Sequence, residues 1–241
     1  MEPKKELAEK IIVALDVRTK DRALDLVKQL KNVQTFKVGL ELFTSEGTLL
    51  IQELHRLGKN IFLDLKMHDI PNTVAGAVRS GFIHKVSIMT LHAFGGVEMM
   101  RRAAAEAKNL SEETGEAKPL LLAVTILTSL KGDDLRQLGI KTKLDDQVLK
   151  LAFLAKKAGM DGLVCSPRET KMIKKEVGKD LLIVNPGIRP SWASSDDQKR
   201  VTTPAQAVKN GADLLVIGRP VTQASDPEEA FLRICRELDS P

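Results

Sequence analysis

The fold is decided by the stretch Ile61-Phe-Leu-Asp-Leu-Lys-Met-His-Asp-Ile-Pro-Asn-Thr73, in which a short apolar run ends in charged residues around a proline. Asp64 and Lys66 are two positions apart, so on a strand they project from the same face. Pro71 suits the first turn of a helix, where its missing N–H is not needed. The stretch therefore predicts a buried strand that leads into a helix, with an acid and a lysine side by side at the junction.

Short apolar runs of this kind alternate with longer amphipathic segments along the sequence. The predicted strands are residues 11–16, 36–39, 61–66, 86–92, 120–127, 162–166, 181–186 and 214–218. The predicted helices are residues 21–30, 42–57, 73–80, 97–108, 145–158, 167–176, 204–210 and 227–238. Leucine and alanine recur in the helical segments about every three to four residues, which indicates one buried face on each helix.

Near-continuous apolar strands that alternate with helices are typical of a parallel sheet covered by helices. Eight such units predict an α/β fold of the (β/α)8 TIM-barrel type. Residues 1–241 would form a single domain, since this length is ordinary for one such barrel. A doubly wound sheet is the alternative. Its dinucleotide-binding form is disfavoured, because no Gly-x-Gly-x-x-Gly follows the first strand.

The composition argues against several classes of protein. Only 3% of the residues are aromatic and none is tyrosine, which disfavours a stacking platform for single-stranded nucleic acid. The net charge of +5 is modest, so we expect anionic ligands but no binding to nucleic acid. The first residues lack the apolar core of a signal peptide, and no apolar run approaches the ~18 residues of a membrane span. Cys165 and Cys235 form no metal-spaced pair, and we expect free thiols in a cytoplasmic protein that does not bind membranes.

Polar residues lie at or just beyond the carboxyl ends of the predicted strands. In a parallel barrel these ends meet on one face, where active sites are found. The residues are Asp16, Lys37, Asp64, Lys66, His92, Thr128 and Arg219. Each one alone would be interpreted as a solvated loop residue, but seven on one rim indicate a functional site.

The connections after the last two strands have the composition of a phosphate site. They read Asn185-Pro-Gly-Ile-Arg-Pro190 and Val216-Ile-Gly-Arg-Pro220. A glycine in each lets backbone amides approach an anion, and Arg189 and Arg219 suit bidentate phosphate contacts. Barrels often bind phosphate with these two loops, so the pair predicts a phosphate site.

Two connections are longer than the others. Residues 189–202 lie on the predicted functional face and are small and polar, which favours a mobile lid, although an ordinary surface loop has the same composition. Residues 109–119 join a helix to the fifth strand at the opposite face, where we expect a plain loop.

Four charged residues, Lys37, Asp64, Lys66 and Asp69, could form an alternating network in which each acid contacts a cation. Neighbouring carboxylates favour the ammonium form of Lys66, which suits a general acid better than a Schiff-base nucleophile. A surface salt-bridge cluster, worth ~0–1 kcal/mol per pair, is one alternative. A Mg²⁺ site made by Asp64, Asp69 and Glu41 is another. It is disfavoured because Lys66 stands between the two aspartates.

Residues 62–73 resemble the signature of the orotidine 5′-phosphate decarboxylase family, and the resemblance extends nearly end to end. The other matching motifs are Val13-Ala-Leu-Asp16, Lys37-Val-Gly, Leu91-His-Ala, Val124-Thr-Ile-Leu-Thr-Ser129, Val164-Cys-Ser166, Pro186-Gly-Ile-Arg-Pro190 and Val216-Ile-Gly-Arg-Pro-Val-Thr-Gln223. The pattern Asp-x-Lys-x-x-Asp alone is shared by related barrel enzymes that act on keto-sugar phosphates. All motifs together are most similar to the bacterial branch of the decarboxylase family.

The resemblance implies a carboxy-lyase that converts orotidine 5′-phosphate to uridine 5′-phosphate and CO₂, the last step of de novo UMP synthesis, without metal or cofactor. Lys66 would protonate C6 of the pyrimidine beside Asp64, and Lys37 and Asp69 would complete the charged network. A homodimer is implied, in which Asp69, Ile70 and Thr73 reach the neighbouring site. The remaining substrate contacts implied are Asp16 and Lys37 at the ribose, Thr128 at the pyrimidine, and Arg189, Gln198, Gly218 and Arg219 at or near the phosphate.

The residues themselves fit this chemistry, since an ammonium at C6 stabilises a carbanion that the ring cannot delocalise. A Mg²⁺-dependent keto-sugar-phosphate decarboxylase or aldolase of the same barrel group is the alternative, and chelators should inactivate it. A non-catalytic phosphate binder is a third possibility, which would bind uridine 5′-phosphate without turnover.

Overall fold

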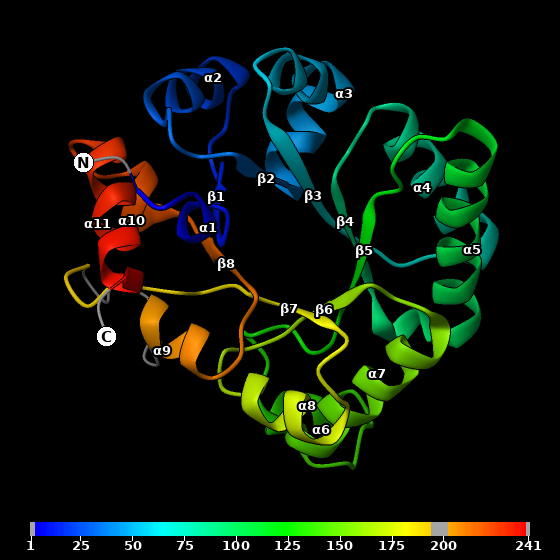
Figure 1. Cartoon of the computed structure of the whole chain (residues 1–241). Coiled ribbons are helices and arrows are strands. Elements are labelled where there is room, and N and C mark those ends of the chain that lie inside the picture. Colours follow the sequence, from blue (N-terminus) through cyan, green and yellow to red (C-terminus); the bar gives the residue numbers. More distant parts are fainter. Residues whose placement is uncertain (1–2, 194–201, 240–241) are drawn as a thin grey trace.

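Eight parallel strands close into a barrel in this computed structural model, which describes residues 3–193 and 202–239 (Figure 1). Each strand pairs with the next along the chain, and the last pairs with the first. The strands are β1 (Ile11–Ala14), β2 (Thr35–Gly39), β3 (Asn60–Met67), β4 (Ile88–His92), β5 (Leu120–Val124), β6 (Gly162–Val164), β7 (Leu182–Asn185) and β8 (Leu214–Ile217). The predicted TIM-barrel class is confirmed, and all eight predicted strands are found within a few residues of their expected bounds.

Helices form the outer layer around the barrel (Figure 1). They are α1 (Lys5–Ala8), α2 (Lys20–Gln29), α3 (Leu40–Arg56), α4 (Pro71–Ile83), α5 (Gly96–Thr114), α6 (Gly132–Gln137), α7 (Leu144–Ala158), α8 (Thr170–Glu176), α9 (Pro204–Lys209), α10 (Arg219–Thr222) and α11 (Pro227–Asp239), with a 3-10 turn η1 (Ala93–Gly95). The eight predicted helices are all present. The short elements α1, α6, α10 and η1 were not predicted, because so few residues show no helical period.

One predicted loop is wrong over half its length. Residues 109–114, expected to be irregular, continue α5 to Thr114. The helix ends at Gly115, which adopts a left-handed conformation with φ of 73°. The polar residues that suggested a loop mostly lie on the solvent side of this last turn, where they carry no signal of helical packing.

The apolar residues form two layers of core. The inner cluster fills the barrel and consists of Ile12, Ala14, Phe62, Ile88, Leu122, Val124, Val164, Val184 and Val216. The larger cluster lies between the strands and the surrounding helices. Side chains alternate between the two faces of a strand, so Lys37 and Asp64 point into the barrel, as Phe62 of the inner cluster does. They lie nearer the carboxyl ends of the strands than that cluster.

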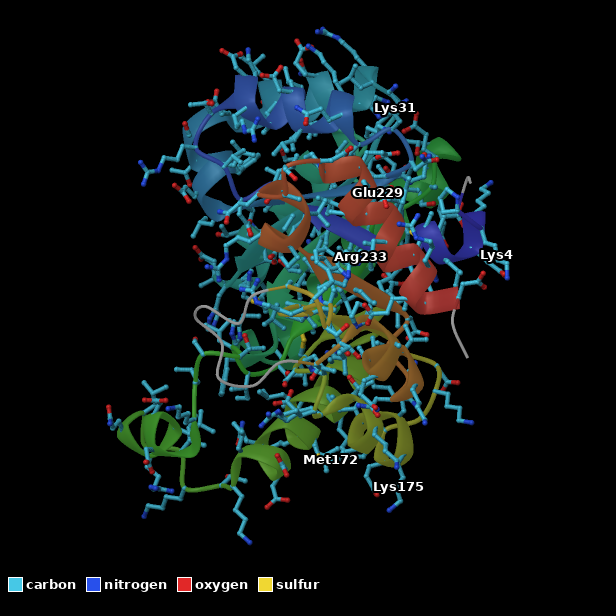
Figure 2. The ribbon with its side chains drawn as sticks, turned by 90° about the vertical axis from the view of Figure 1, so that its left-hand side faces the viewer. Lys4, Lys31, Met172, Lys175, Glu229 and Arg233 are labelled. Carbon is cyan, nitrogen blue, oxygen red and sulfur yellow. The ribbon has the colours of Figure 1, made fainter. Side chains whose placement is uncertain are left out.

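The two ends of the described chain lie close together. In Figure 2, α1 lies beside α11. Lys4, just before α1, forms an ion pair with Asp239 of α11, with Nζ 2.5 Å from Oδ1. No helix within residues 3–193 and 202–239 is long and apolar enough to cross a membrane.

Candidate active site

The carboxyl end of β3 departs from regular strand geometry. Leu63 pairs with Met89 of β4, but the next pair is Met67 with Leu91, so residues 64–66 stand opposite a single β4 residue, Thr90. Lys66 has a φ of 50°, in the left-handed region that costs a non-glycine residue roughly 1–2 kcal/mol. The strand predicted for residues 61–66 is present within β3, but its register against β4 shifts at this end, which the sequence did not indicate. Backbone strain of this kind concentrates at functional sites.

Four charged side chains, from β2, β3 and the segment just after β1, alternate in sign at this end of the barrel. Lys66 Nζ lies 2.9 Å from Asp64 Oδ2, and Lys37 Nζ lies 3.8 Å from the same oxygen. Lys37 Nζ also donates to Asp16 Oδ1 at 3.0 Å. We call Asp16, Lys37, Asp64 and Lys66 the charge network. Its two central side chains, Lys37 and Asp64, are only 11% and 12% exposed, which distinguishes it from a solvated surface cluster.

Asp69 was predicted to belong to this network, but within one chain it lies apart from it. Its Oδ1 accepts a hydrogen bond from the amide of Ile70 at 2.6 Å, and it makes no ion pair among the described residues. Ile70 is 66% exposed, and Thr73 is exposed in the first turn of α4. Pro71 begins α4, as the sequence predicted. Asp69, Ile70 and Thr73 therefore form an exposed corner next to the charge network.

The two loops predicted to bind phosphate follow the adjacent strands β7 and β8. Gly187 has a φ of 74°, which a residue with a side chain rarely adopts. A Cβ at Gly218 would lie 3.2 Å from Asp16 Oδ2, so a side chain at this position would require the Asp16 carboxylate to shift by a few tenths of an ångström. Arg219 begins the short helix α10 directly after Gly218. The structure thus brings the loop after β8 next to Asp16, which lies just beyond the end of β1.

Arg189 follows β7 and is only 7% exposed. Its Nε atom is buried without a hydrogen-bond partner among the described residues, which is costly for a guanidinium. Its backbone N–H donates to the carbonyl of Thr202 at 3.1 Å, so the two ends of the predicted lid meet. Near the start of the predicted lid, the ring of Trp192 packs against Arg233 of α11, whose Cζ lies 4.6 Å from the ring centroid. Gln198 and the rest of residues 194–201 lie outside the described residues.

Other rim residues have simpler surroundings. Thr128 is exposed in the turn after β5. His92 stacks on His68 with ring centroids 5.8 Å apart, and its Nδ1 accepts from the amide of Phe94 at 3.4 Å. Burial lowers the pKa of His92, and the nearby His68 and Lys66 add to this effect. His92 therefore lies near Lys66 of the charge network, and His68 stacks against His92.

One residue of the site was missed from the sequence. Thr90 of β4 is fully buried, accepts from the backbone N–H of Lys66 at 2.9 Å and donates to Asp64 Oδ1 at 2.9 Å. The signal that could have found it was a single hydroxyl inside the otherwise apolar run of residues 88–91. Such buried hydroxyls require partners.

The residues suggested for a Mg²⁺ site are engaged elsewhere. Asp64 contacts Lys66, Lys37 and Thr90, and Glu41 pairs with Arg18 at 3.9 Å. Across residues 3–193 and 202–239, no group of three or more histidine, cysteine, aspartate or glutamate side chains is placed to hold a metal ion.

The fold and the site define a (β/α)8-barrel enzyme with a lysine–aspartate network at the carboxyl ends of its strands. Residues 9–234 match the model of the orotidine 5′-phosphate decarboxylase / HUMPS family, and the chain belongs to this family. The resemblance drawn from the motifs is thereby confirmed.

Relatives of this chain share most of its length. Orotidine 5′-phosphate decarboxylase of Syntrophomonas wolfei is 49% identical over 234 residues, which cover 96% of this chain and 98% of the relative. The enzyme of that name from Actinobacillus succinogenes is 49% identical and covers 95% of this chain and 97% of its own. The crystal structure of orotidine 5′-phosphate decarboxylase from Lactobacillus acidophilus matches with a TM-score of 0.85 at 39% identity, covering 95% of this chain and 99% of that one.

Proposed function

We propose that this protein is a carboxy-lyase that converts orotidine 5′-phosphate to uridine 5′-phosphate and CO₂, the last step of de novo UMP synthesis. The observation that carries the proposal is the ammonium of Lys66, held 2.9 Å from the buried carboxylate of Asp64. Full-length relatives at 49% identity bear the name of this activity. We also propose a cytoplasmic location, since both cysteines are buried free thiols, as is usual in reducing compartments.

Lys66 is the proposed proton donor. Loss of CO₂ from C6 leaves an electron pair in the plane of the pyrimidine ring, where the π system cannot accept it. An ammonium fixed beside C6 stabilises this charge as it forms and then transfers a proton to it. The reaction then needs no metal or cofactor. Because Asp64 already forms an ion pair with Lys66, a divalent cation would have to displace the Lys66 ammonium to bind there.

Asp64 has two proposed effects. Its carboxylate holds the Lys66 ammonium in place, and its negative charge disfavours the substrate carboxylate that must leave as CO₂. Both of its oxygens are already bound by protein donors, Lys66 and Thr90, which fixes the orientation of the group. Preorganised charges of this kind need no rearrangement at the moment of reaction.

The remaining contacts are proposed to hold the nucleotide by its distant parts. Asp16 and Lys37 bind the ribose hydroxyls, and Thr128 faces the pyrimidine. Arg189, Gln198, Gly218 and Arg219 bind the phosphate or support its loop. The buried Nε of Arg189 supports this assignment, because a phosphate oxygen would supply the partner that it lacks among the described residues. Binding energy at the phosphate and ribose can then drive assembly of the site around C6.

The active form is proposed to be a homodimer in which Asp69, Ile70 and Thr73 act in the neighbouring site. Asp69 is exposed beside its own charge network without joining it, which supports a role in another subunit. Leu40, Ile70 and Phe94 are exposed apolar side chains at the carboxyl ends of the neighbouring strands β2, β3 and β4. Apolar residues grouped in this way favour a subunit interface.

The activity is tested by mixing the protein with orotidine 5′-phosphate and following the orotate absorbance with and without EDTA. We expect turnover that EDTA does not change. A stable spectrum with folded protein would reject the proposal, and tight binding of uridine 5′-phosphate without turnover would favour a non-catalytic binder. Loss of activity in EDTA would favour the Mg²⁺-dependent lyase.

The shared site is tested by mixing inactive Lys66→Ala and Asp69→Ala proteins and allowing the subunits to exchange. Each heterodimer should contain one site that carries both native residues, so activity should return. If exchange is proven by mass spectrometry of tagged subunits and activity stays absent, Asp69 acts within its own subunit.

A further inference from the structure

At the irregular end of β3, the backbone N–H of Lys66 does not donate to a backbone carbonyl of β4. Three β3 residues, 64–66, face the single residue Thr90, so the Lys66 amide has no regular ladder partner on β4. The amide instead donates to the hydroxyl of Thr90 at 2.9 Å. Thr90 is fully buried, so no exposed water competes for this position.

The same hydroxyl fixes the carboxylate beside Lys66. A threonine hydroxyl has one proton to donate, and here it is directed at Asp64 Oδ1, 2.9 Å away. The other oxygen, Asp64 Oδ2, holds Lys66 Nζ at 2.9 Å. Thr90 therefore closes a ring that runs from the Lys66 amide through Thr90 and Asp64 to the Lys66 ammonium.

We propose that Thr90 is a positioning residue for the proton donor. It keeps Lys66 in its left-handed conformation and Asp64 in the rotamer that directs the ammonium over the barrel mouth. The proposal rests on the proposed function, because it concerns the group that would protonate C6. Thr90 itself lies below the network and touches the reaction only through Asp64 and Lys66.

If residue 90 only filled space in the core, valine would suit the position better than threonine. Valine has the same shape and suits a buried strand, but it would leave the Lys66 amide and one Asp64 oxygen without partners. Lys66 could then relax from φ of 50° toward ordinary strand geometry, which would move its ammonium away from Asp64. A shift of about 1 Å at a reacting group can cost roughly 10²-fold in rate.

The test compares Thr90→Val with Thr90→Ser, which keeps the hydroxyl. We expect Thr90→Val to lower kcat by roughly 10²-fold with KM changed by less than about threefold, and Thr90→Ser to restore most of kcat. Thr114→Val is the matched control. The Thr114 hydroxyl also accepts from a backbone amide, that of Glu116 at 3.2 Å, and donates to an oxygen, the carbonyl of Leu110 at 2.7 Å, but it lies at the last residue of α5 and contacts no residue of the proposed site, so its loss should leave kcat unchanged.

A crystal structure of Thr90→Val gives a readout that needs no turnover. We expect Lys66 at negative φ and its Nζ more than about 4 Å from Asp64, beyond ion-pair range. If wild type does not turn over orotidine 5′-phosphate but this geometry changes, the proposed function fails and the positioning role stands. If wild type turns over and Thr90→Val keeps both its kcat and its Lys66 geometry, the positioning role is rejected. Should Thr90→Val fail to fold, Thr90→Cys, with a weak thiol donor, tests the same change to a smaller degree.

Discussion

Both ends of the barrel carry aspartate–lysine pairs, but the pairs are bonded differently. At the amino end, Asp213 precedes β8, accepts from the amide of Ile183 at 2.7 Å and pairs with Lys174 at 2.8 Å. Asp161 precedes β6 and does the same with the amide of Leu121 and with Lys118. At the carboxyl end, Asp64 accepts hydrogen bonds from two side chains, Lys66 and Thr90, and forms an ion pair with Lys37 at 3.8 Å, with no strand amide among its partners in the described part of the chain.

The difference separates stability from function. An aspartate that accepts a hydrogen bond from the backbone N–H of the neighbouring strand ties the two strands together. Lys174 strengthens this link, because its Nζ donates to Asp213 and also to the carbonyl of Leu181, just before β7. Among the described residues, Asp64 accepts no hydrogen bond from a strand amide. It forms ion pairs with Lys66 and Lys37 at the carboxyl ends of the strands. Conserved barrel geometry assigns stability to the amino face and chemistry to the carboxyl face, and the bonding pattern here follows that division.

The largest expected effect is on activity. It is measured by removing a lysine from each end of the barrel in turn, Lys66 at the carboxyl end and Lys174 at the amino end. Lys66→Ala should lower kcat/KM by on the order of 10⁴-fold or more, because the proposed proton donor and its stabilising charge are both removed. Its free energy of unfolding should change by less than ~1 kcal/mol, since Asp64 keeps Lys37 and Thr90 as partners. Lys174→Ala should do the reverse, with kcat retained and stability lost. Equal activity in the two variants would remove the distinction between the two ends.

The next effect is on stability at the amino end. Asp213→Ala should lower the free energy of unfolding by about 2–3 kcal/mol, because the Ile183 amide and Lys174 both lose a partner. Asp180→Ala is the control, since Asp180 pairs with Lys156 on the surface and binds no strand amide. It should cost less than ~1 kcal/mol. Urea unfolding of both variants measures the difference, and equal losses would show that the strand amide is unimportant.

The smallest expected effect is on the pH dependence of stability. It concerns Glu169, a carboxylate near the carboxyl ends of the strands that forms no ion pair with a lysine among the described residues. Glu169, between β6 and α8, is buried and accepts from the amide of Ser166 at 3.0 Å. Burial raises its pKa from 4.5 to about 7. The folded state thus holds this proton more tightly than the unfolded state, so its contribution to stability is full below about pH 4.5 and is lost as the pH rises through about 7.

Glu169→Gln should remove this pH dependence, because the amide oxygen can still accept from Ser166 but cannot ionise. At pH 8 the variant should be roughly 1–2 kcal/mol more stable than wild type, and near pH 4.5 the two should be alike. Glu176→Gln, at the exposed last residue of α8, serves as the control. Parallel stability curves for wild type and Glu169→Gln from pH 4 to 8 would contradict the assignment.

Much of the fold and part of the site followed from local patterns. The apolar run before Asp64 identified β3, and Pro71 marked the start of α4, because burial and helix entry depend on neighbouring residues alone. The positions of Asp16, Lys37 and Lys66 at strand ends followed from the same pattern. The left-handed Lys66 and the role of Thr90 did not, because they arise from the register between β3 and β4. Register depends on residues about 25 positions apart and leaves no local period.

The sequence by itself therefore determined the order of the main strands and helices and the rim on which the charged residues gather, and it favoured a closed barrel over a doubly wound sheet. Each of these depends on periodicity and on residue type. Only the tertiary structure decided which charges meet. It placed Asp16 with Lys37, left Asp69 outside its own network, and set Thr90 beneath Lys66. These contacts depend on how neighbouring strands are aligned, and that alignment is fixed only when the barrel closes.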